Sequence, residues 1–177
     1  LGDVYKRQID TLIERLKNGV SISFEMPRLP ALFESHAEYE QFCCRHARAS
    51  VARGELSAYR GNCYLGIDAG STTTKMALIG ENGELLYSYY TNNNGNPIEA
   101  AKKGIHELQT LMPGNAKIVR ACSTGYGEAL LQAAFSLDDG EVETIAHCTA
   151  ASFFDPKVDC VLDIGGQDMK CIKIKNQ

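Results

Sequence analysis

The sequence predicts an α/β protein, because short apolar runs typical of strands alternate with helical segments along most of its 177 residues. Two of the apolar runs end in an acid followed by glycine, at residues 66–70 (GIDAG) and 163–166 (DIGG). The order strand–strand–strand–helix opens the main part of the chain, and a strand pair opens again after residue 157. We therefore expect two related halves, with the second half truncated.

Composition is that of an ordinary folded protein and argues against several classes. Apolar residues make up 44% and charged residues 23%, with a formal net charge of −4. The sequence contains no run of five lysines or arginines, so a footprint of nucleic-acid binding is not evident. No apolar stretch reaches the roughly 18 residues of a membrane helix, and no signal-peptide pattern opens the chain. We expect a cytoplasmic protein with neither nucleic acid nor membrane as a partner.

The seven cysteines predict reduced thiols. Their number is odd and none forms a C-x-x-C pair, so a disulfide framework is not indicated. Four of them lie in apolar strand-like runs, which favours burial: Cys63, Cys122, Cys160 and Cys171.

The pattern of elements divides the chain into four parts. Residues 1–8 (LGDVYKRQ) are predicted to be a non-native end, and 9–61 the end of a preceding unit plus a linker, with helices at 9–18 and 35–52. Residues 62–157 are expected to form a first half and 158–177 the start of a second. We expect strands at 63–68, 75–79, 85–90, 117–122, 158–164 and 169–175, and helices at 97–112, 126–135 and 142–154.

The first motif, residues 66–75 (GIDAGSTTTK), suits a polyphosphate with a divalent cation. Glycine lets backbone amides approach phosphate oxygens, hydroxyl groups and a lysine add donors, and the aspartate is a ligand for Mg²⁺. It lacks both the Walker A spacing and G-x-G-x-x-G. A Ser/Thr-rich hairpin turn is the alternative. The residues concerned are Asp68, Gly70, Ser71, Thr72, Thr73, Thr74 and Lys75.

The second motif repeats this design, and its alternative is a tight Gly-Gly hairpin. Two such hairpins, one opening each half, could hold one nucleotide between them. Its residues are Asp163, Ile164, Gly165, Gly166, Gln167 and Asp168. Two further segments, 123–128 (STGYGE) and 143–147 (ETIAH), can lie near this site or be a plain turn and a structural histidine.

These four segments together, in this order, resemble the BadF/BadG/BcrA/BcrD-type ATPases, above all the long tandem-fusion activases. That family comprises activators of 2-hydroxyacyl-CoA dehydratases and ATPase subunits of benzoyl-CoA reductases. The resemblance implies a ribonuclease H-like half of an ATPase of the actin-like, acetate kinase and sugar kinase superfamily, with ATP or ADP in the cleft. It implies Asp68, Asp163 and Lys75 as catalytic residues, Asp68 and Asp163 as magnesium ligands, and the glycines and polar residues of both motifs as nucleotide ligands.

The resemblance also implies a function and partners. Family members use ATP hydrolysis to drive a low-potential electron from a 4Fe-4S cluster, held between two subunits, to a CoA-ester dehydratase or reductase. None of the cysteines in this sequence matches the cluster ligands, so the cluster is expected only in the full-length protein. The full-length protein is expected to be a homodimer or to contain a tandem intramolecular pair of units. We expect the fragment itself to have little ATPase activity. The alternatives are a small-molecule kinase of the same superfamily and a non-hydrolysing nucleotide-sensing module.

Overall fold

The computed structural model describes residues 9–19, 29–165 and 168–175, and groups the chain into two compact units, 1–49 and 50–177. The segment 1–8, expected to be non-native, lies outside the described residues, as do Gly166 and Gln167 of the second motif. Within the described residues, no helix is long and apolar enough to cross a membrane.

The first unit contains two helices with largely exposed surfaces. Helix α1 (Ile9–Asn18) carries its apolar side chains at helical spacing, as the sequence predicts. Helix α2 (His36–Ala47) is shorter than the predicted 35–52. Ser35 caps it, because its hydroxyl accepts a hydrogen bond from the Glu38 amide at 3.2 Å.

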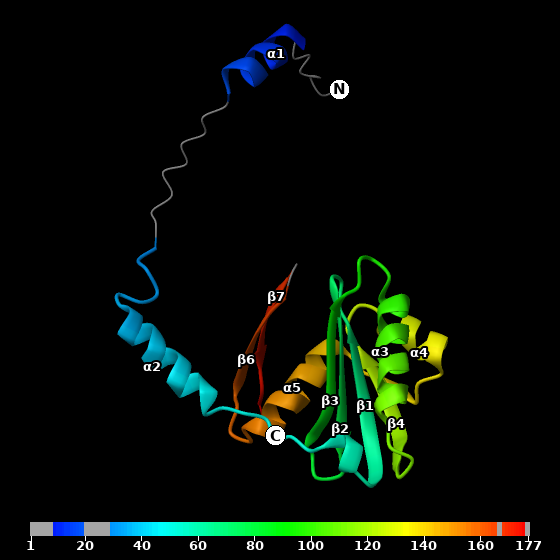
Figure 1. The fold of residues 1–177 in the computed structure, drawn as a ribbon. Helices are drawn as coiled ribbons and strands as arrows, with labels where there is room; N and C mark the ends of the chain where they lie inside the picture. Colours follow the sequence, from blue (N-terminus) through cyan, green and yellow to red (C-terminus); the bar gives the residue numbers. More distant parts are fainter. Residues whose placement is uncertain (1–8, 20–28, 166–167, 176–177) are drawn as a thin grey trace. The chain divides into compact units, whose positions relative to one another are not determined.

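The second unit is built on a five-stranded mixed sheet in the order β3-β2-β1-β4-β5 (Figure 1). The first three strands are antiparallel neighbours, whereas β4 and β5 run parallel to β1. The strands are β1 (Gly61–Ala69), β2 (Thr73–Gly80), β3 (Leu85–Asn92), β4 (Ala116–Thr124) and β5 (Asp139–Gly140).

Three helices lie on the two faces of this sheet. Helices α3 (Pro97–Leu111) and α4 (Glu128–Phe135) pack on one face, and α5 (Glu143–Phe154) lies on the other side (Figure 1). The core fills the α3/α4 face. Strand alternation sends one set of side chains into it, including Cys63, Leu65, Ile67, Ala69, Thr74, Met76 and Leu78. The other set, which includes Asp68 and Lys75, therefore faces the α5 side.

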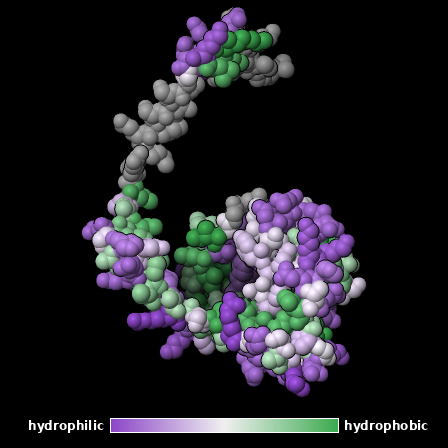
Figure 2. Space-filling model, in the orientation of Figure 1, coloured by the Kyte–Doolittle hydropathy of each residue, from purple (hydrophilic) through white to green (hydrophobic). Residues whose placement is uncertain are grey.

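A separate two-stranded hairpin follows α5. Strands β6 (Cys160–Ile164) and β7 (Met169–Lys173) are antiparallel, with Asp163 opposite Lys170. The outer face of the hairpin is apolar and exposed, as Figure 2 shows: Leu162 is 69% exposed, and Ile164 and Met169 are each 74% exposed. Cys160 and Cys171 share this exposed face, so the expectation that they are buried is wrong, while Cys63 is buried as expected.

Two features differ from the sequence-based expectation in detail. Strand β5 was not predicted, because its two residues contain no apolar side chain and it exists only by pairing with Cys122 and Ser123 of β4. Residues 50–61, expected to be linker, group with the sheet: Leu56 is buried, and Arg53 bridges to Leu85 of β3. The domain boundaries proposed from the sequence remain a prediction.

Candidate functional site

The first acid–glycine motif forms the hairpin between β1 and β2. Asp68 lies directly opposite Lys75 in the strand register, and the Lys75 Nζ is 2.8 Å from Asp68 Oδ2. This hydrogen bond raises the pKa of the Lys75 ammonium above its ordinary value. Lys75 therefore stays protonated at neutral pH, and its side chain is about half exposed, whereas the Asp68 side chain is mostly buried.

One oxygen of the Asp68 carboxylate is available to a ligand. Asp68 Oδ1 is buried and has no hydrogen-bond partner among the described residues, a costly arrangement for a charged oxygen. Gly125 makes room for it: a Cβ there would lie 2.5 Å from that oxygen, and φ of Gly125 is +86°. A carboxylate oxygen held without a partner fits a hard divalent cation such as Mg²⁺.

The loop between β1 and β2 is tied in place by Asn93. The side chain of Asn93 donates to the Gly70 carbonyl at 2.8 Å, and its backbone amide donates to the Thr72 carbonyl at 2.9 Å. The Gly70 amide closes the turn onto the Thr73 carbonyl at 2.9 Å, so that amide is used within the loop. Ser71 and Thr72 are exposed, whereas Thr74 points into the core, away from the predicted site.

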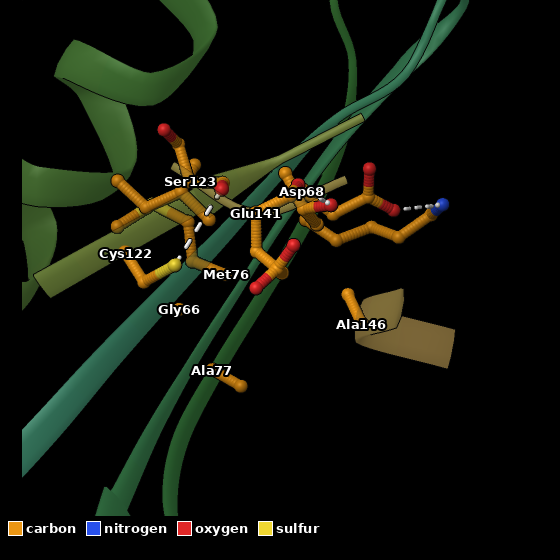
Figure 3. Close-up of a pocket in the computed structure, with 11 residues that line it drawn as sticks. Gly66, Asp68, Met76, Ala77, Cys122, Ser123, Glu141 and Ala146 are labelled. Carbon is orange, nitrogen blue, oxygen red and sulfur yellow. Dashed lines mark hydrogen bonds and ion pairs between the residues drawn. The ribbon is translucent and has the colours of Figure 1, made fainter. Parts of the chain in front are cut away.

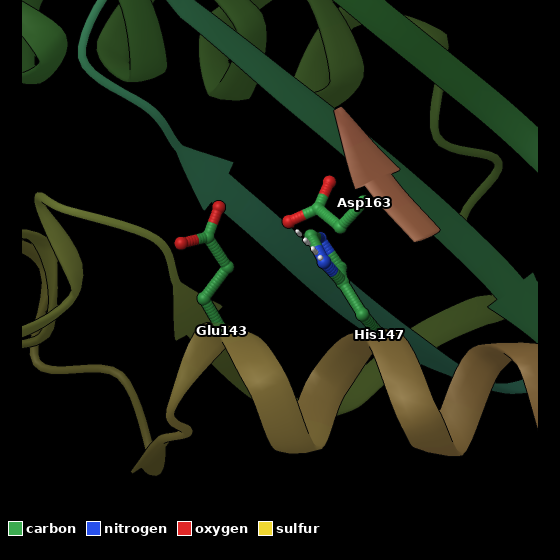
Figure 4. A group of neighbouring side chains, drawn as sticks. All are labelled: Glu143, His147 and Asp163. Atoms are coloured by element: carbon green, nitrogen blue, oxygen red, sulfur yellow. Dashed lines mark ion pairs between the residues drawn. The ribbon is translucent and has the colours of Figure 1, made fainter. Parts of the chain in front are cut away.

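The second motif meets helix α5. Figure 4 shows Glu143 and His147, one helical turn apart on α5, pointing toward Asp163 on β6. His147 Nδ1 is 3.2 Å from Asp163 Oδ2, and the potential ligand atoms of the three residues all lie within 4.8 Å of one another. Two carboxylates and an imidazole at this spacing could also hold a metal ion.

Lys170 supplies a cation to this cluster. Its Nζ lies 2.8 Å from Glu143 Oε2, 2.8 Å from Asp168 Oδ2 and 3.7 Å from Asp163 Oδ2. The hydrogen bonds to Asp168 and then to Glu143 raise the pKa of the Lys170 ammonium, which stays protonated. At the hairpin turn, the Gly165 amide donates to the Asp168 carbonyl at 2.9 Å.

A cavity of about 510 Å³ brings the two motifs together. Its walls come from the first loop, from the turn after β4, from the start of α5 and from the second motif: Gly70, Ser71, Gly125, Tyr126, Glu128, Val142, Glu143 and Asp168. The lining combines backbone turns, two hydroxyl groups and three carboxylates, so a phosphate would need a cation beside it to offset the acids.

A second cavity, of about 290 Å³, contains the first acid–lysine pair. Figure 3 shows Asp68 with its ion pair, close to Ser123 of β4 and to Glu141, which directly follows β5. The remaining lining of this cavity is largely apolar and comes mainly from Gly66, Ile67, Met76, Ala77, Cys122 and Ala146.

The predicted site residues thus fall into three groups. Asp68 and Lys75 form one ion pair, Gly70, Ser71 and Asp168 line the larger cavity, and Asp163 lies in the α5 cluster. The others shape turns: Thr72, Thr73 and Gly165. Sequence reasoning missed two contributors, Asn93 and Lys170, whereas Gly125 and Glu143 lie in the candidate segments 123–128 and 143–147. The signal that could have found Lys170 is its spacing from Asp163, which equals that of Lys75 from Asp68.

The structural neighbours of this mixed α/β fold are actin-like ATPase activators. The fold matches the crystal structure of component A of the (R)-2-hydroxyglutaryl-CoA dehydratase from Acidaminococcus fermentans, with a TM-score of 0.56 and 31% identity over 66% of this chain and 44% of that one. The activator of the 2-hydroxyisocaproyl-CoA dehydratase from Clostridium difficile with bound ADPNP has the same fold, with a TM-score of 0.56 and 24% identity over 64% of this chain and 41% of that one. The predicted fold class is confirmed.

The chain belongs to the BadF/BadG/BcrA/BcrD ATPase family, whose model matches residues 65–177. An uncharacterized protein of Methanocaldococcus jannaschii is 38% identical over 112 residues, which are 62% of this chain and 42% of that protein. The (R)-2-hydroxyglutaryl-CoA dehydratase activating ATPase of Acidaminococcus fermentans is 30% identical over 112 residues, 63% of this chain and 42% of that protein. The chain therefore spans less than half the length of these relatives.

Proposed function

We propose that this chain is part of an ATP-dependent activase that binds Mg²⁺ and ATP between its two acid–glycine hairpins. The observation that carries the proposal is the cavity of about 510 Å³ that Gly70 and Ser71 share with Asp168. Membership of an ATPase family supports the nucleotide. A structural relative in the same fold carries ADPNP, an ATP analogue.

Each predicted residue has a proposed role. Asp68, through its unpartnered oxygen, and Asp163 are the proposed Mg²⁺ ligands, and Mg²⁺ would neutralise charge on the phosphates. Lys75 places a positive charge beside Asp68, where it can contact a phosphate oxygen. The loops at 70–73 and 165–168 supply backbone and hydroxyl donors, with Gly166 and Gln167 as proposed ligands outside the described residues.

The activase part of the proposal rests on the relatives. Two of them are activators of dehydratases that act on CoA esters, the 2-hydroxyglutaryl and the 2-hydroxyisocaproyl compound. We propose a partner of that kind, or a benzoyl-CoA reductase-like enzyme, which receives a low-potential electron when ATP is hydrolysed. A cytoplasmic location and a homodimer or tandem pair belong to the same proposal.

A full set of four cluster ligands is not brought together among the cysteines of the described residues. Among the described residues, no three of them come together, and the sulfurs of Cys160 and Cys171 lie 3.9 Å apart. A 4Fe-4S cluster takes four thiolates, so this pair alone would supply half of them. The residues described here therefore account for the nucleotide part of the proposal, and the cluster is proposed to be held by other cysteines of a longer protein.

Calorimetric titration with Mg²⁺ and ATP, and with Mg²⁺ and tripolyphosphate, tests the nucleotide part. Tripolyphosphate probes the phosphate contacts alone, without requiring an adenosine site. We expect Asp68→Asn to abolish Mg²⁺-dependent binding, because it removes the charge of the proposed metal ligand. The control is Asp10→Asn, the same substitution at an exposed residue of α1 outside both motifs, and it should leave binding within about twofold. An affinity for ATP or tripolyphosphate that is unchanged both without Mg²⁺ and in Asp68→Asn would contradict the proposal.

A further inference from the structure

The two hairpins place an acid and a lysine in the same geometry. Seven residues separate Asp68 from Lys75, and the two are opposite each other in the β1–β2 register. The same separation joins Asp163 to Lys170, again directly opposite in the β6–β7 register. The proposed site therefore contains two ammonium groups, one on each hairpin, and the first is already assigned to the phosphates.

The two lysines differ in the number of acids around them. Lys75 forms its short ion pair with Asp68, at 2.8 Å. Lys170 contacts three carboxylates, with Glu143 and Asp168 both at 2.8 Å and Asp163 at 3.7 Å. The single lysine ammonium faces three carboxylates, so this cluster has more acidic side chains than lysines. The excess favours an additional cation and holds Lys170 on the protein while none is bound.

Lys170 is also next to the shared cavity. Glu143 and Asp168, its two short partners, both line the cavity that Gly70 and Ser71 enter from the other hairpin. A lysine ammonium is a compact charge on a flexible stem, so it can change partners over a few ångströms at small cost. Its side chain is 30% exposed, which leaves room for such a change.

We propose that Lys170 is a phosphate-binding residue, the counterpart on the second hairpin of Lys75 on the first, and that Glu143 competes with the phosphate for it. This inference rests on the proposed function. Under this inference, removing the Lys170 ammonium weakens phosphate binding, whereas removing the Glu143 charge strengthens it. A salt bridge that merely holds the hairpin to α5 would give both variants the same sign, since each removes one partner of the bridge.

The test measures binding of Mg²⁺-tripolyphosphate and Mg²⁺-pyrophosphate to the full chain by calorimetry. We expect Lys170→Met to weaken tripolyphosphate binding about 10- to 100-fold, the range for loss of one hydrogen bond between charged groups. Glu143→Gln keeps the shape, frees Lys170 from one acid and should tighten binding about three- to tenfold. The matched control is Lys173→Met, with the same charge change on the same strand, where residue 173 faces Cys160 on the outer side. It should bind like the unmodified protein.

The outcomes separate the two proposals. If neither Asp68→Asn nor Lys75→Met changes binding, the proposed function fails and this inference with it. If Asp68→Asn abolishes binding while Lys170→Met behaves like Lys173→Met, the nucleotide site stands and Lys170 is not a phosphate ligand. Weaker binding in Glu143→Gln would likewise overturn the inference. Circular dichroism of each variant identifies any that fails to fold. If Lys170→Met does not fold, Glu143→Gln still tests the inference, because its binding should become tighter and not weaker.

Discussion

Gly125 controls the space beside the Asp68 carboxylate. It adopts φ +86°, and a Cβ would meet both Asp68 Oδ1 at 2.5 Å and the Ala69 carbonyl at 2.8 Å. Replacing it therefore adds a collision with the proposed metal ligand to the strain of a left-handed backbone. Replacing Gly125 should therefore weaken ligand binding as well as lower the stability of the fold.

We expect Gly125→Ala to weaken Mg²⁺-tripolyphosphate binding at least about tenfold and to lower the free energy of unfolding by about 2–4 kcal/mol. The control is Gly95→Ala, at φ +78° with no atom within 4 Å of the added Cβ. It has the same backbone strain, so it should lose only about 1–2 kcal/mol and keep binding. Calorimetry and urea unfolding measure both quantities. Equal binding by the two variants would show that Gly125 matters only for its backbone.

The pairing of side chains within one sequence motif could be predicted, whereas the pairing of side chains brought together by tertiary packing could not. Asp68 and Lys75 lie in one continuous motif, so a hairpin at that position implies their pairing. Lys170 and Glu143 are 27 residues apart, and their contact requires α5 to pack against the β6–β7 hairpin. No local pattern encodes that packing, which is why the acid cluster around Lys170 was not predicted.

Among the elements, helix α3 depends on a close approach to the sheet. Gly104 lies on its buried face, where an added Cβ would be 2.5 Å from Met76 Sδ and 2.8 Å from the Tyr89 ring. Alanine favours a helix over glycine by about 1 kcal/mol, which opposes the cost of the collision. Overpacking in a core typically costs about 1–3 kcal/mol, so the collision should dominate.

We therefore expect Gly104→Ala to lower the free energy of unfolding by about 1–2 kcal/mol. Gly114→Ala serves as the control, because Gly114 has nothing within 4 Å of its added Cβ and lies outside the helix. It should change stability by no more than about 0.5 kcal/mol. Urea unfolding gives both values. A stabilised Gly104→Ala variant would mean that α3 can move away from the sheet at little cost.

The short strand β5 is attached to β4 by an ion pair. Arg120 Nε donates to Asp139 Oδ2 at 2.7 Å, and this hydrogen bond is the main cause that lowers the pKa of Asp139 below its ordinary value. A carboxyl with a lowered pKa in the folded state adds stability above its unfolded pKa of roughly 4. That stability is lost as the pH falls through the folded pKa. Both side chains are largely exposed, so the effect should be small.

Arg120→Met should accordingly lower Tm slightly at pH 7, and the difference from the unmodified protein should shrink as the pH falls below about 4. Thermal unfolding monitored by circular dichroism between pH 7 and pH 3 measures it. Lys117→Met, on the same strand, is the control and should show a difference that does not follow this pH range. A difference for Arg120→Met that stays constant to pH 3 would argue against the ion pair as its source.

Most helices and strands could be predicted from the periodicity of apolar residues and from turn-forming residues. Apolar alternation located β1 to β4, and the Asn82–Gly83 pair correctly marked the turn between β2 and β3. Strand β5 escaped because Asp139 and Gly140 have neither apolar character nor length. A two-residue strand is defined by its neighbour in the sheet, so its presence is a tertiary effect rather than a local preference.

On the scale of the whole molecule, residues 50–61 belong to the sheet unit. The Leu85 amide donates to the Ala52 carbonyl at 2.8 Å, the Gly54 amide donates to the Leu85 carbonyl at 3.1 Å, and Leu56 is buried in the core. A cut made after Ala49 keeps these contacts, and a cut made after Gly61 removes them.

We expect a protein that starts at Ser50 to retain the unfolding transition of the sheet unit. One that starts at Asn62 should lose about 2–4 kcal/mol, from the burial of Leu56 and the lost backbone hydrogen bonds. Thermal and urea unfolding of the two truncated proteins measure this. Equal stability would place the boundary of the unit at residue 62, as the sequence alone suggests.

The position of Tyr126 offers a direct optical view of the shared cavity. Its side chain is 93% exposed and lines the cavity between the two hairpins, and the chain contains no tryptophan. Tyr126→Trp would therefore install a single indole, excitable at a wavelength where the tyrosines absorb little. Its emission would shift toward shorter wavelength and resist quenching by iodide when a ligand covers it. Occupancy of the cavity could then be followed on the stopped-flow timescale, separately from turnover.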